Sequence, residues 1–487
     1  MAEVNAILER FPRERPWLLP ALQALQHHSR WLSPEALTAA AQHLRVPQSE
    51  VYGVATHYPE FRLSPPGRRV VRICTGISCR ISGSLDLLRA CERSLGVSAD
   101  GTTADGAVTL ERLDCAFNCS VAPVIESEGK QYGRVGARDL ETILSAPPHI
   151  SPHPFPLPKG ERENRTLSPF GGEGSKLPLP SGERAGVRGR ETTARLRPTI
   201  PPPDGLTFVV GAGTCGLSVG AGNVLAALEA ELAHRSLSAR VVAGGCNGCC
   251  WVAPVVTVLG SNGSRRTVGR VSADGIPALL EAAAADRLTD DLEIRQFLSG
   301  QRHALIDRCG VTDPADIDDA IRHGSYTVLA ELLAAGKPDR VIETVKAAGL
   351  RGRGGAYFQA ALKWEGARQV QGEPKYLIVN GEEGEPGIFK DRHLMEGDPH
   401  RLIEGTLLAA YAAGASKAIL YIHGEARLSA LRLEKALEEA HECGLIGKRV
   451  LGSDFSIEVE IRRGAGGFVL GEETALMESL EGRRAMP

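Results

Sequence analysis

The stretch RICTGISCRISGS, residues 72–84, places Cys74 and Cys79 in a loop rich in glycine and serine, directly after the apolar run VVRI. A helical pattern and a further strand follow, and a second pair of cysteines, Cys115 and Cys119, lies in the loop CAFNC. Glycine, serine and asparagine around the thiols are typical of loops rather than of a core. Two loops at strand ends can bring four thiols to one centre. The pattern therefore predicts a compact α/β unit built around a cysteine site.

The compartment in which the chain works limits what its eleven cysteines can do. The chain has 487 residues, and its formal net charge of −3 gives no basic field that would attract nucleic acid. The N-terminus has no apolar signal segment, and apolar stretches fall short of the ~18–20 residues that span a bilayer. We therefore expect a cytoplasmic chain without nucleic-acid partners or membrane insertion. Thiols stay reduced in that compartment, so clustered cysteines indicate metal or redox chemistry.

The spacing of the four thiols leaves the bound metal open. Four residues separate Cys74 from Cys79, 35 separate Cys79 from Cys115, and three separate Cys115 from Cys119. Structural zinc sites use pairs that are about two to four residues apart, whereas four cysteines on wider loops hold [2Fe-2S] clusters. The spacing favours iron and sulfur over zinc. Four reduced thiols in an apolar core are the third interpretation.

Changes in composition divide the chain into four segments. Residues 1–146 start with helical periodicity, with Ser33 as a helix N-cap, and continue into the α/β unit. Residues 147–204 are rich in Pro, Gly and Arg and predict a disordered linker. Residues 205–288 repeat the α/β plan, and residues 289–487 mix strands with longer helices. The predicted fold class is multidomain α/β.

The second α/β unit contains a glycine motif that imitates a dinucleotide fingerprint. GAGTCG, residues 211–216, has the G-x-G-x-x-G order after an expected strand. The next expected strand, ARVVAGGC, lacks the acidic residue that would bind a ribose, so we reject this interpretation. We instead align the unit with the first one. The alignment pairs Cys215 with Cys74, Cys246 with Cys115, Cys250 with Cys119, and Gly220 with Cys79.

Three matched thiols leave cluster binding by the second unit open, with Cys249 as a spare. The isolated cysteines Cys91, Cys309 and Cys443 are expected to be buried apolar thiols.

Three motifs in the last segment combine glycines, cations and acids. They are GLRGRGGAYFQAALKW (349–364), VNGEEGEPGIFKDR (379–392) and GAGGFVLGEETALMESLEG (464–482). Glycines let the backbone approach a phosphate closely, and cations neutralise it. The acids can accept hydrogen bonds from hydroxyl groups. A solvated loop or a helix cap explains any one of these motifs but not the three together.

The N-terminal region resembles a known family. YGVATHYPEFRLSPPGRR, CTGISCRISGS and CAFNCSVAPVIE are similar to the small iron–sulfur subunit of respiratory NADH dehydrogenase (complex I) and to its counterparts in NAD-linked formate dehydrogenases and hydrogenases. The resemblance covers residues 1–145. It implies a helical bundle followed by a thioredoxin-like domain with a [2Fe-2S] cluster on Cys74, Cys79, Cys115 and Cys119. Residues 205–288 resemble the degenerate thioredoxin-like domain of the soluble relatives, and Cys215, Cys246 and Cys250 are their candidate metal ligands.

The three motifs of the last segment resemble the NADH-oxidising flavoprotein subunit of the same complexes, from about residue 300 onward. The resemblance implies an FMN site on matching positions, which are Gly352, Gly354, Gly355, Lys363, Asn380, Glu382, Glu383, Gly471, Glu472 and Glu473. It implies NADH contacts at Arg353, Ala356, Phe358, Glu385 and Phe468, with Glu385 and Phe468 as the catalytic candidates. Tyr357 stands where the family has glycine, which puts the shape of the nucleotide pocket in doubt.

The resemblance implies an electron-transfer function. Hydride would pass between NAD(H) and FMN, and single electrons would pass to iron–sulfur clusters, within a complex of the formate dehydrogenase or hydrogenase type. A fused NADH-oxidising subunit of complex I and an inactive, scaffolding remnant are the alternatives. Family members continue beyond Pro487 into a domain with a CGxCxPC motif, so we expect a C-terminally truncated chain without a [4Fe-4S] site of its own.

Overall fold

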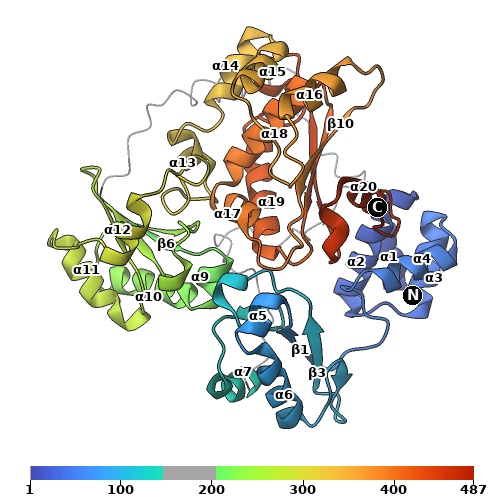
Figure 1. Ribbon diagram of the computed structural model, residues 1–487, viewed down its shortest axis with the longest axis horizontal. Coiled ribbons are helices and arrows are strands. Elements are labelled where there is room, and N and C mark those ends of the chain that lie inside the picture. Colours follow the sequence, from blue (N-terminus) through green and yellow to red (C-terminus); the bar gives the residue numbers. More distant parts are fainter. Residues whose placement is uncertain (1, 146–204) are drawn as a thin grey trace.

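The structure is a computed structural model that describes residues 2–145 and 205–487. The expected linker, residues 147–204, lies outside the described residues. Figure 1 shows a helical bundle, two small α/β modules and a larger C-terminal domain. The expected mixture of a bundle with α/β units is confirmed, whereas the domain boundaries drawn from the sequence stay predictions. No helix among residues 2–145 and 205–487 combines the length and the apolar character needed to cross a bilayer.

The N-terminal helical bundle packs against the end of the chain. Ser33 caps a helix as expected, since its Oγ accepts the N–H of Ala36 at 3.1 Å. Leucines of the bundle share one buried core with Leu470 and Leu476, and Tyr58 donates to the carbonyl of Arg483 at 2.9 Å. The bundle comprises α1 (Ala2–Leu8), η1 (Arg15–Trp17), α2 (Leu18–Ser29), α3 (Pro34–Leu44) and α4 (Gln48–His57).

The first α/β module, residues 69–145, is a five-stranded sheet in the order β2-β3-β1-β4-β5. β1 runs parallel to β3 and antiparallel to β4, so the ends of β1 and β3 lie at the same edge. Its strands are β1 (Arg69–Cys74), β2 (Gly101–Thr102), β3 (Val108–Leu113), β4 (Ile125–Ser127) and β5 (Lys130–Tyr132). Its helices are α5 (Ile77–Ile81), α6 (Ser84–Leu95), η2 (Cys119–Val121), η3 (Ala137–Asp139) and α7 (Leu140–Ser145).

The second module, residues 206–284, repeats this plan with a four-stranded sheet in the order β7-β6-β8-β9. β6 runs parallel to β7 and antiparallel to β8, as β1 does with β3 and β4. Its strands are β6 (Leu206–Gly211), β7 (Ala239–Gly244), β8 (Val256–Leu259) and β9 (Arg265–Val268). Its helices are α9 (Thr214–Ser218), α10 (Ala221–His234), η4 (Cys250–Val252), η5 (Ala273–Gly275) and α11 (Ile276–Ala284), and α12 (Leu292–Ser299) follows.

The C-terminal domain is built on three parallel strands in the order β10-β11-β12. The carboxyl ends of parallel strands meet at one edge, so the loops that follow β10 and β12 lie together there. The strands are β10 (Tyr376–Gly381), β11 (Lys417–Ile422) and β12 (Glu458–Arg463). The helices are α13 (Ile317–Arg322), α14 (Thr327–Ala335), α15 (Pro338–Ala347), α16 (Ala360–Gln369), α17 (Lys390–Gly397), α18 (Pro399–Ala413), α19 (Arg427–Glu442), η6 (Val450–Gly452), η7 (Phe468–Gly471) and α20 (Glu473–Leu480).

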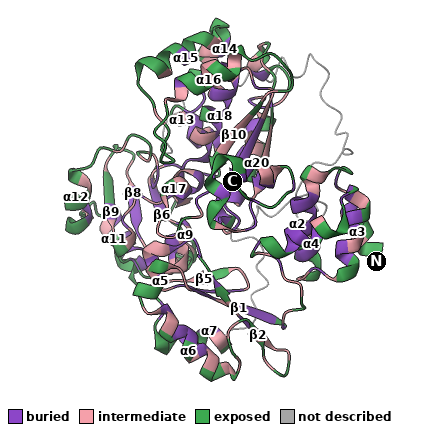
Figure 2. Ribbon diagram, turned by 45° about the vertical axis from the view of Figure 1, so that its right-hand side comes forward, coloured by how far each residue is buried: buried purple, intermediate pink, exposed green. Residues whose placement is uncertain are grey.

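Helix α17 lies where the C-terminal domain meets the two modules (Figure 1). Figure 2 shows buried residues along the sheets and at this junction. The polar residues that the junction buries include Arg392 and Glu396 of α17 and Asn118 of the first module. The cysteine loops therefore lie inside the molecule and next to the C-terminal domain.

Candidate functional site

The four cysteines of the first module converge at one edge of its sheet. Cys74 ends β1, Cys79 lies in α5, Cys115 follows β3 and Cys119 starts η2. The Sγ atoms of Cys115 and Cys119 are 3.9 Å apart, and Cys74 shares hydrogen bonds with Cys79 and Cys115. The parallel pairing of β1 with β3 produces this convergence, because both cysteine loops leave the same edge.

Backbone N–H groups point at three of these sulfurs. Ala116 donates to Cys74 at 3.4 Å, Phe117 donates to Cys115 at 3.3 Å, and Gly387 of the C-terminal domain donates to Cys119 at 3.2 Å. Hydrogen bonds of this kind stabilise sulfur that carries negative charge, as in iron–sulfur sites. Four thiols with such donors fit a [2Fe-2S] cluster. No three His, Cys, Asp or Glu side chains in the described part of the chain are arranged to hold a single metal ion, and the ligand assignment stays a prediction.

The thiols share protons unevenly. Hydrogen bonds from Cys115 and Cys79 lower the pKa of Cys74 to about 3, and a hydrogen bond from Cys115 lowers the pKa of Cys119 to about 6. Hydrogen bonding to Cys74 raises the pKa of Cys79, and hydrogen bonding to Cys119 raises the pKa of Cys115. Because thiol ligands must be deprotonated, loading a metal here releases the protons that the thiols share.

The structure corrects the alignment of the two modules. α5 and α9 both follow a capping glycine, Gly76 or Gly213, and the next helices both start after a glycine at positive φ, Gly83 or Gly220. The strand pairings agree with this register. The alignment by residue type was therefore wrong for β6 and α9. Cys74 corresponds to Gly211, Cys79 to Gly216, Ser78 to Cys215, and Gly83 to Gly220, while Cys115 and Cys119 still correspond to Cys246 and Cys250.

Two of the four ligand positions are consequently glycine in the second module. A Cβ atom on Gly216 would overlap the carbonyl oxygen of Gly211, so no side chain fits there. Cys215 forms a hydrogen bond with Cys250, as Ser78 does with Cys119 in the first module. The second module thus has three nearby thiols but a different arrangement.

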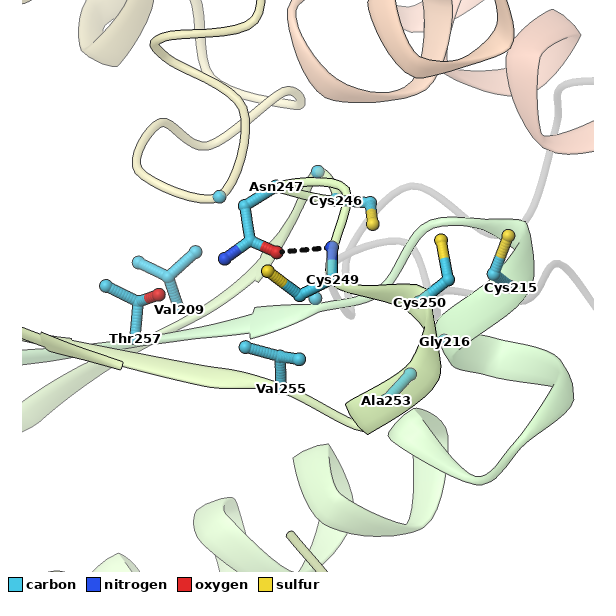
Figure 3. Close-up of a pocket in the computed structure, with 13 residues that line it drawn as sticks. Val209, Cys215, Gly216, Cys246, Asn247, Cys249, Cys250, Ala253, Val255 and Thr257 are labelled. Atoms are coloured by element: carbon cyan, nitrogen blue, oxygen red, sulfur yellow. Dashed lines mark hydrogen bonds between the residues drawn. The ribbon is translucent and has the colours of Figure 1, made fainter. Parts of the chain in front are cut away.

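Figure 3 shows how these thiols lie. Cys215 and Cys250 point their sulfurs to the same side with Cys246 nearby, whereas the sulfur of Cys249 points away from them. Cys249 packs in an apolar cluster with Val255, and burial raises its pKa to about 11. Cys249 is therefore a core thiol.

The expectation that the three isolated cysteines are buried is confirmed for two of them. Cys91 and Cys309 are buried, as expected. Cys443 is only half-buried, because it lies at the end of α19.

The C-terminal motifs meet beyond the carboxyl edge of the three-stranded sheet. Asn380 at the end of β10 donates through Nδ2 to the carbonyl of Gly471 at 2.9 Å. Lys363 of α16 forms an ion pair with Glu473 at the start of α20, with 3.1 Å between Nζ and Oε2. Both side chains of this pair are exposed. The three glycine and acid motifs, far apart in the sequence, thus form one surface.

Glu382 is a buried acid behind this surface, and one of its oxygens lacks a hydrogen-bond donor in the described residues. One carboxylate oxygen, Oε1, forms a short hydrogen bond with Nδ1 of His423, while Oε2 is buried and has no hydrogen-bond partner among the described residues. Burial lowers the pKa of His423, but the bond to Glu382 and nearby carboxylates outweigh burial and raise it. A buried acceptor without a donor fits the N–H or O–H group of a bound flavin.

Two other predicted flavin ligands, Glu383 and Glu472, accept backbone hydrogen bonds at the starts of helices instead. The carboxylate of Glu383 accepts three backbone N–H groups at the start of α17, from Lys390 at 2.7 Å, Asp391 at 2.9 Å and Arg392 at 3.2 Å. Glu472 caps α20 by accepting the N–H groups of residues 474 and 475, and hydrogen bonds to Thr474 lower its pKa. Their contact with a flavin stays a prediction, because the oxygens that form these bonds are already engaged.

The glycine-rich loop leaves room for a ligand. Gly352 donates to the carbonyl of Phe358 at 2.8 Å, which closes the loop. Cβ atoms added at Gly354 or Gly355 would meet no atom within 4 Å, so the loop has the open space that a phosphate needs. The predicted positions Arg353, Ala356 and Phe358 are exposed on this loop.

The aromatic residues around this loop are exposed. Tyr357, at the family's glycine position, has a φ of +55°, is 62% exposed, and stacks on Arg351 at 5.0 Å. Phe468, across the surface, is 67% exposed. The carbonyl of Glu385 accepts the N–H of Ile388 at 3.1 Å, which shapes the turn before α17. A Cβ added to Gly384 would lie 2.9 Å from the carbonyl oxygen of Gly467, so the loops that carry Glu385 and Phe468 lie side by side.

Two regions of the chain match known family models. Residues 4–147 match the thioredoxin-like [2Fe-2S] ferredoxin, and residues 345–487 match the Nuo51 FMN-binding domain. These matches confirm the resemblances of the N-terminal region and of the three C-terminal motifs, and the fold class drawn from the sequence.

Curated relatives match over part of their length. The chain is 52% identical over 164 residues to the F 2 subunit of NADH-quinone oxidoreductase from Rhizobium meliloti (strain 1021), covering 34% of this chain and 39% of the relative. It is 45% identical over 179 residues to the HndC subunit of the NADP-reducing hydrogenase from Solidesulfovibrio fructosivorans, covering 37% of this chain and 36% of the relative. The chain thus spans about two fifths of the first of these relatives.

A solved structure has the same fold over nearly the whole chain. The crystal structure of NAD+-reducing [NiFe]-hydrogenase in the air-oxidized state matches with a TM-score of 0.52 at 21% identity, covering 98% of this chain and 56% of that one. At this identity the likeness concerns the fold alone.

Proposed function

From the two family matches we propose that this chain is the NADH-oxidising module of a larger oxidoreductase complex. It exchanges hydride between NAD(H) and FMN and delivers single electrons to iron–sulfur clusters. One observation carries the proposal: the two matched regions meet, since Gly387 of the FMN-domain motif donates its N–H to Cys119 of the ferredoxin domain. FMN, when bound, converts two-electron hydride chemistry into one-electron transfer.

The residues around the proposed flavin have separate tasks. Glu382 accepts a hydrogen bond from the flavin through its free oxygen, and the glycine-rich loop with Lys363 binds the phosphate. Asn380, Glu383, Gly471, Glu472 and Glu473 shape the pocket through the contacts described above. The nucleotide takes the exposed side, where it meets Arg353, Ala356, Phe358, Glu385 and Phe468.

The proposed [2Fe-2S] cluster lies on Cys74, Cys79, Cys115 and Cys119 of the first module. We infer that the second module holds no cluster of this kind, because glycines occupy the positions of Cys74 and Cys79 and Gly216 has no room for a side chain. The three thiols Cys215, Cys246 and Cys250 lack the fourth ligand that the first module has.

The proposed partners are other subunits of an NAD-linked complex of the hydrogenase, formate dehydrogenase or complex I type. Only Cys309 and Cys443 follow residue 300, so a [4Fe-4S] cluster beside the flavin would need ligands from outside these 487 residues. The cytoplasmic location expected from the sequence belongs to the same proposal, and reduced thiols would be available there to hold a cluster.

Lys363→Ala tests the flavin site. Anaerobically reconstituted full chain is expected to bind FMN, and the variant is expected to retain it about tenfold less well or worse, because a charged hydrogen bond to phosphate is worth about 1.5–3 kcal/mol. Lys346→Ala is the matched control, since Lys346 is also exposed and also forms an ion pair with a glutamate, Glu365, at 3.6 Å. Fluorescence of the flavin released on denaturation is the measurement.

The outcomes separate the proposal from a scaffolding role. Equal flavin retention by both variants would place the phosphate elsewhere. Complete absence of flavin binding in the unaltered chain would favour the scaffold, for which Tyr357 at the glycine position is the structural argument. Iron content should be the same in both variants, because neither lysine contacts the cysteine loops.

A further inference from the structure

A short segment of the C-terminal domain, residues 387–392, reaches into the cysteine site of the first module. Gly387 donates to Cys119 Sγ at 3.2 Å. Arg392 donates through Nη1 to the carbonyl oxygen of Phe117, in a short hydrogen bond, and Phe117 lies between the predicted ligands Cys115 and Cys119. The guanidinium carbon of Arg392 is also 5.3 Å from the centre of the Phe117 ring.

Arg392 is a buried cation that lies among cysteines and a carboxylate: burial lowers its pKa, but Cys215, Glu396 and other nearby thiols outweigh burial and raise it. It is the largest side chain that the fold buries almost completely, with 1% of its surface exposed. Its Nη2 donates to Cys215 Sγ at 2.8 Å. Its ion-pair partner is Glu396, with 3.9 Å between Nε and Oε1, and Glu396 also accepts two hydrogen bonds from Thr214. Burying a charge is costly unless an opposite charge lies close by.

The position of Arg392 is fixed from its own backbone. Its N–H, together with those of Lys390 and Asp391, is held by the carboxylate of Glu383. The start of α17 therefore fixes the backbone from which the Arg392 side chain reaches the cysteine loop.

We propose that Arg392 raises the reduction potential of the cluster on Cys74, Cys79, Cys115 and Cys119, and so makes this cluster a better acceptor for electrons from the flavin side. The inference rests on the proposed function. A cluster on four thiolates is anionic, and one-electron reduction adds one negative charge. A fixed cation in a low-dielectric site stabilises the reduced form more than the oxidised form. The same charge balances the burial of Arg392.

The test uses the full chain, reconstituted with iron, sulfide and FMN, and a redox titration followed by the electron paramagnetic resonance signal of the reduced [2Fe-2S] cluster. In Arg392→Gln the equilibrium should shift about tenfold or more toward the oxidised cluster, which is about 59 mV for one electron. Arg392→Lys keeps the positive charge but loses the planar guanidinium group. The redox equilibrium in this variant should therefore shift by less than about threefold.

Arg432→Gln is the matched control. Arg432 is also a buried arginine that joins the C-terminal domain to a module, but it donates to carbonyls of Ala212 and Ala243 in the second module. Loss of a buried interdomain arginine should destabilise both Gln variants, whereas only Arg392→Gln should change the potential. An equal shift in Arg432→Gln would overturn the proposal, because the effect would then be structural.

Other outcomes are equally decisive. An Arg392→Gln chain with normal iron and an unchanged potential overturns the inference and leaves the proposed function intact. A wild-type chain without iron or signal overturns the cluster itself. If Arg392→Gln does not fold, Arg392→Met combined with Glu396→Gln supplies the neutral variant, because replacing both members of a buried ion pair is often tolerated, whereas removing one leaves a buried charge unpaired. If neither neutral variant folds, a tenfold shift in Arg392→Lys overturns the inference, because the charge is kept.

Discussion

The two α/β modules share the pairing of four strands, with β2 as an addition in the first, and have nearly the same helices, yet they differ at the residues that can bind a metal. In the first module β1 ends in Cys74 and α5 carries Cys79, whereas the second module has Gly211 and Gly216 there. Both modules keep the second pair of cysteines, before and at a short 3-10 helix. The comparison shows that this fold does not depend on the ligands, because its core is made by the apolar strands and helices.

The neighbours of the two cysteine sites differ as well. The first site receives an N–H from Gly387 and has Phe117 against Arg392 and His423. At the position of Phe117 the second module has Gly248, so no ring packs there. The first site is thus joined to the proposed flavin site by direct contacts, which supports a role in electron transfer.

The largest expected effect is on the iron content. It is tested by two single variants that remove corresponding cysteines, one in each module. Cys115→Ala should abolish the cluster and the roughly two irons that a [2Fe-2S] centre contributes to each chain. Cys246→Ala, at the corresponding position, should leave the iron content unchanged. Iron analysis and visible absorption of anaerobically reconstituted protein check this. Equal loss of iron in both variants would mean that the second module also binds iron.

A smaller effect, on stability, is expected from replacing Gly216 with alanine. Gly216 is the position at which the first module has the predicted ligand Cys79. Gly216→Ala should destabilise the second module by about 1–3 kcal/mol, because the new Cβ overlaps the carbonyl of Gly211. Cys79→Ala, the counterpart in the first module, already has a Cβ and should keep its fold while losing its ligand. Hydrogen exchange in residues 206–218 and 69–81 measures both. Unchanged exchange in Gly216→Ala would show that the modules are less alike here than the register indicates.

The smallest effect concerns the ring contact that only the first module has. His423 packs on Phe117 at 4.9 Å between ring centres. Burial lowers the pKa of His423, but the carboxylates that face it, Glu382, Glu425 and Glu383, outweigh burial and raise it. A raised pKa in the folded state means that the stabilisation is complete below about pH 6.5 and is lost as pH rises through the folded value.

Thermal unfolding across this pH range tests the histidine. In the unaltered chain the melting temperature should fall as His423 loses its proton, and in His423→Gln this part of the pH dependence should vanish. A pH profile that is the same in both proteins would assign the dependence to other groups, such as the thiols of the first module.

Local sequence patterns predicted much of the fold. SLDLLRACERSL has strong helical periodicity and forms α6, Ser84–Leu95, and the short apolar run KAILYI forms β11, Lys417–Ile422. The short edge strands β5 and β9 were not predicted, since three or four residues give no periodicity.

The parts of the site that lie within one sequence motif could be predicted. The parts that depend on packing between domains could not. The register of Cys215 could have been found from glycines, because Gly76 and Gly83 have the same spacing as Gly213 and Gly220. Arg392 lies in the charged run FKDR, which suggests a solvated turn, and three domains must dock before it is buried. The helix-capping role of Glu383 depends on where α17 starts, seven residues later.

Glu383 has a consequence for how related sequences can diverge. Its carboxylate holds the start of α17, and α17 carries the guanidinium that contacts the cysteine loop of another domain. A substitution at position 383 therefore changes two domains at once and would be tolerated only with compensating changes. Among homologues we expect positions 383, 392 and 117 to co-vary, while Gly248 and its surroundings in the second module drift independently of them.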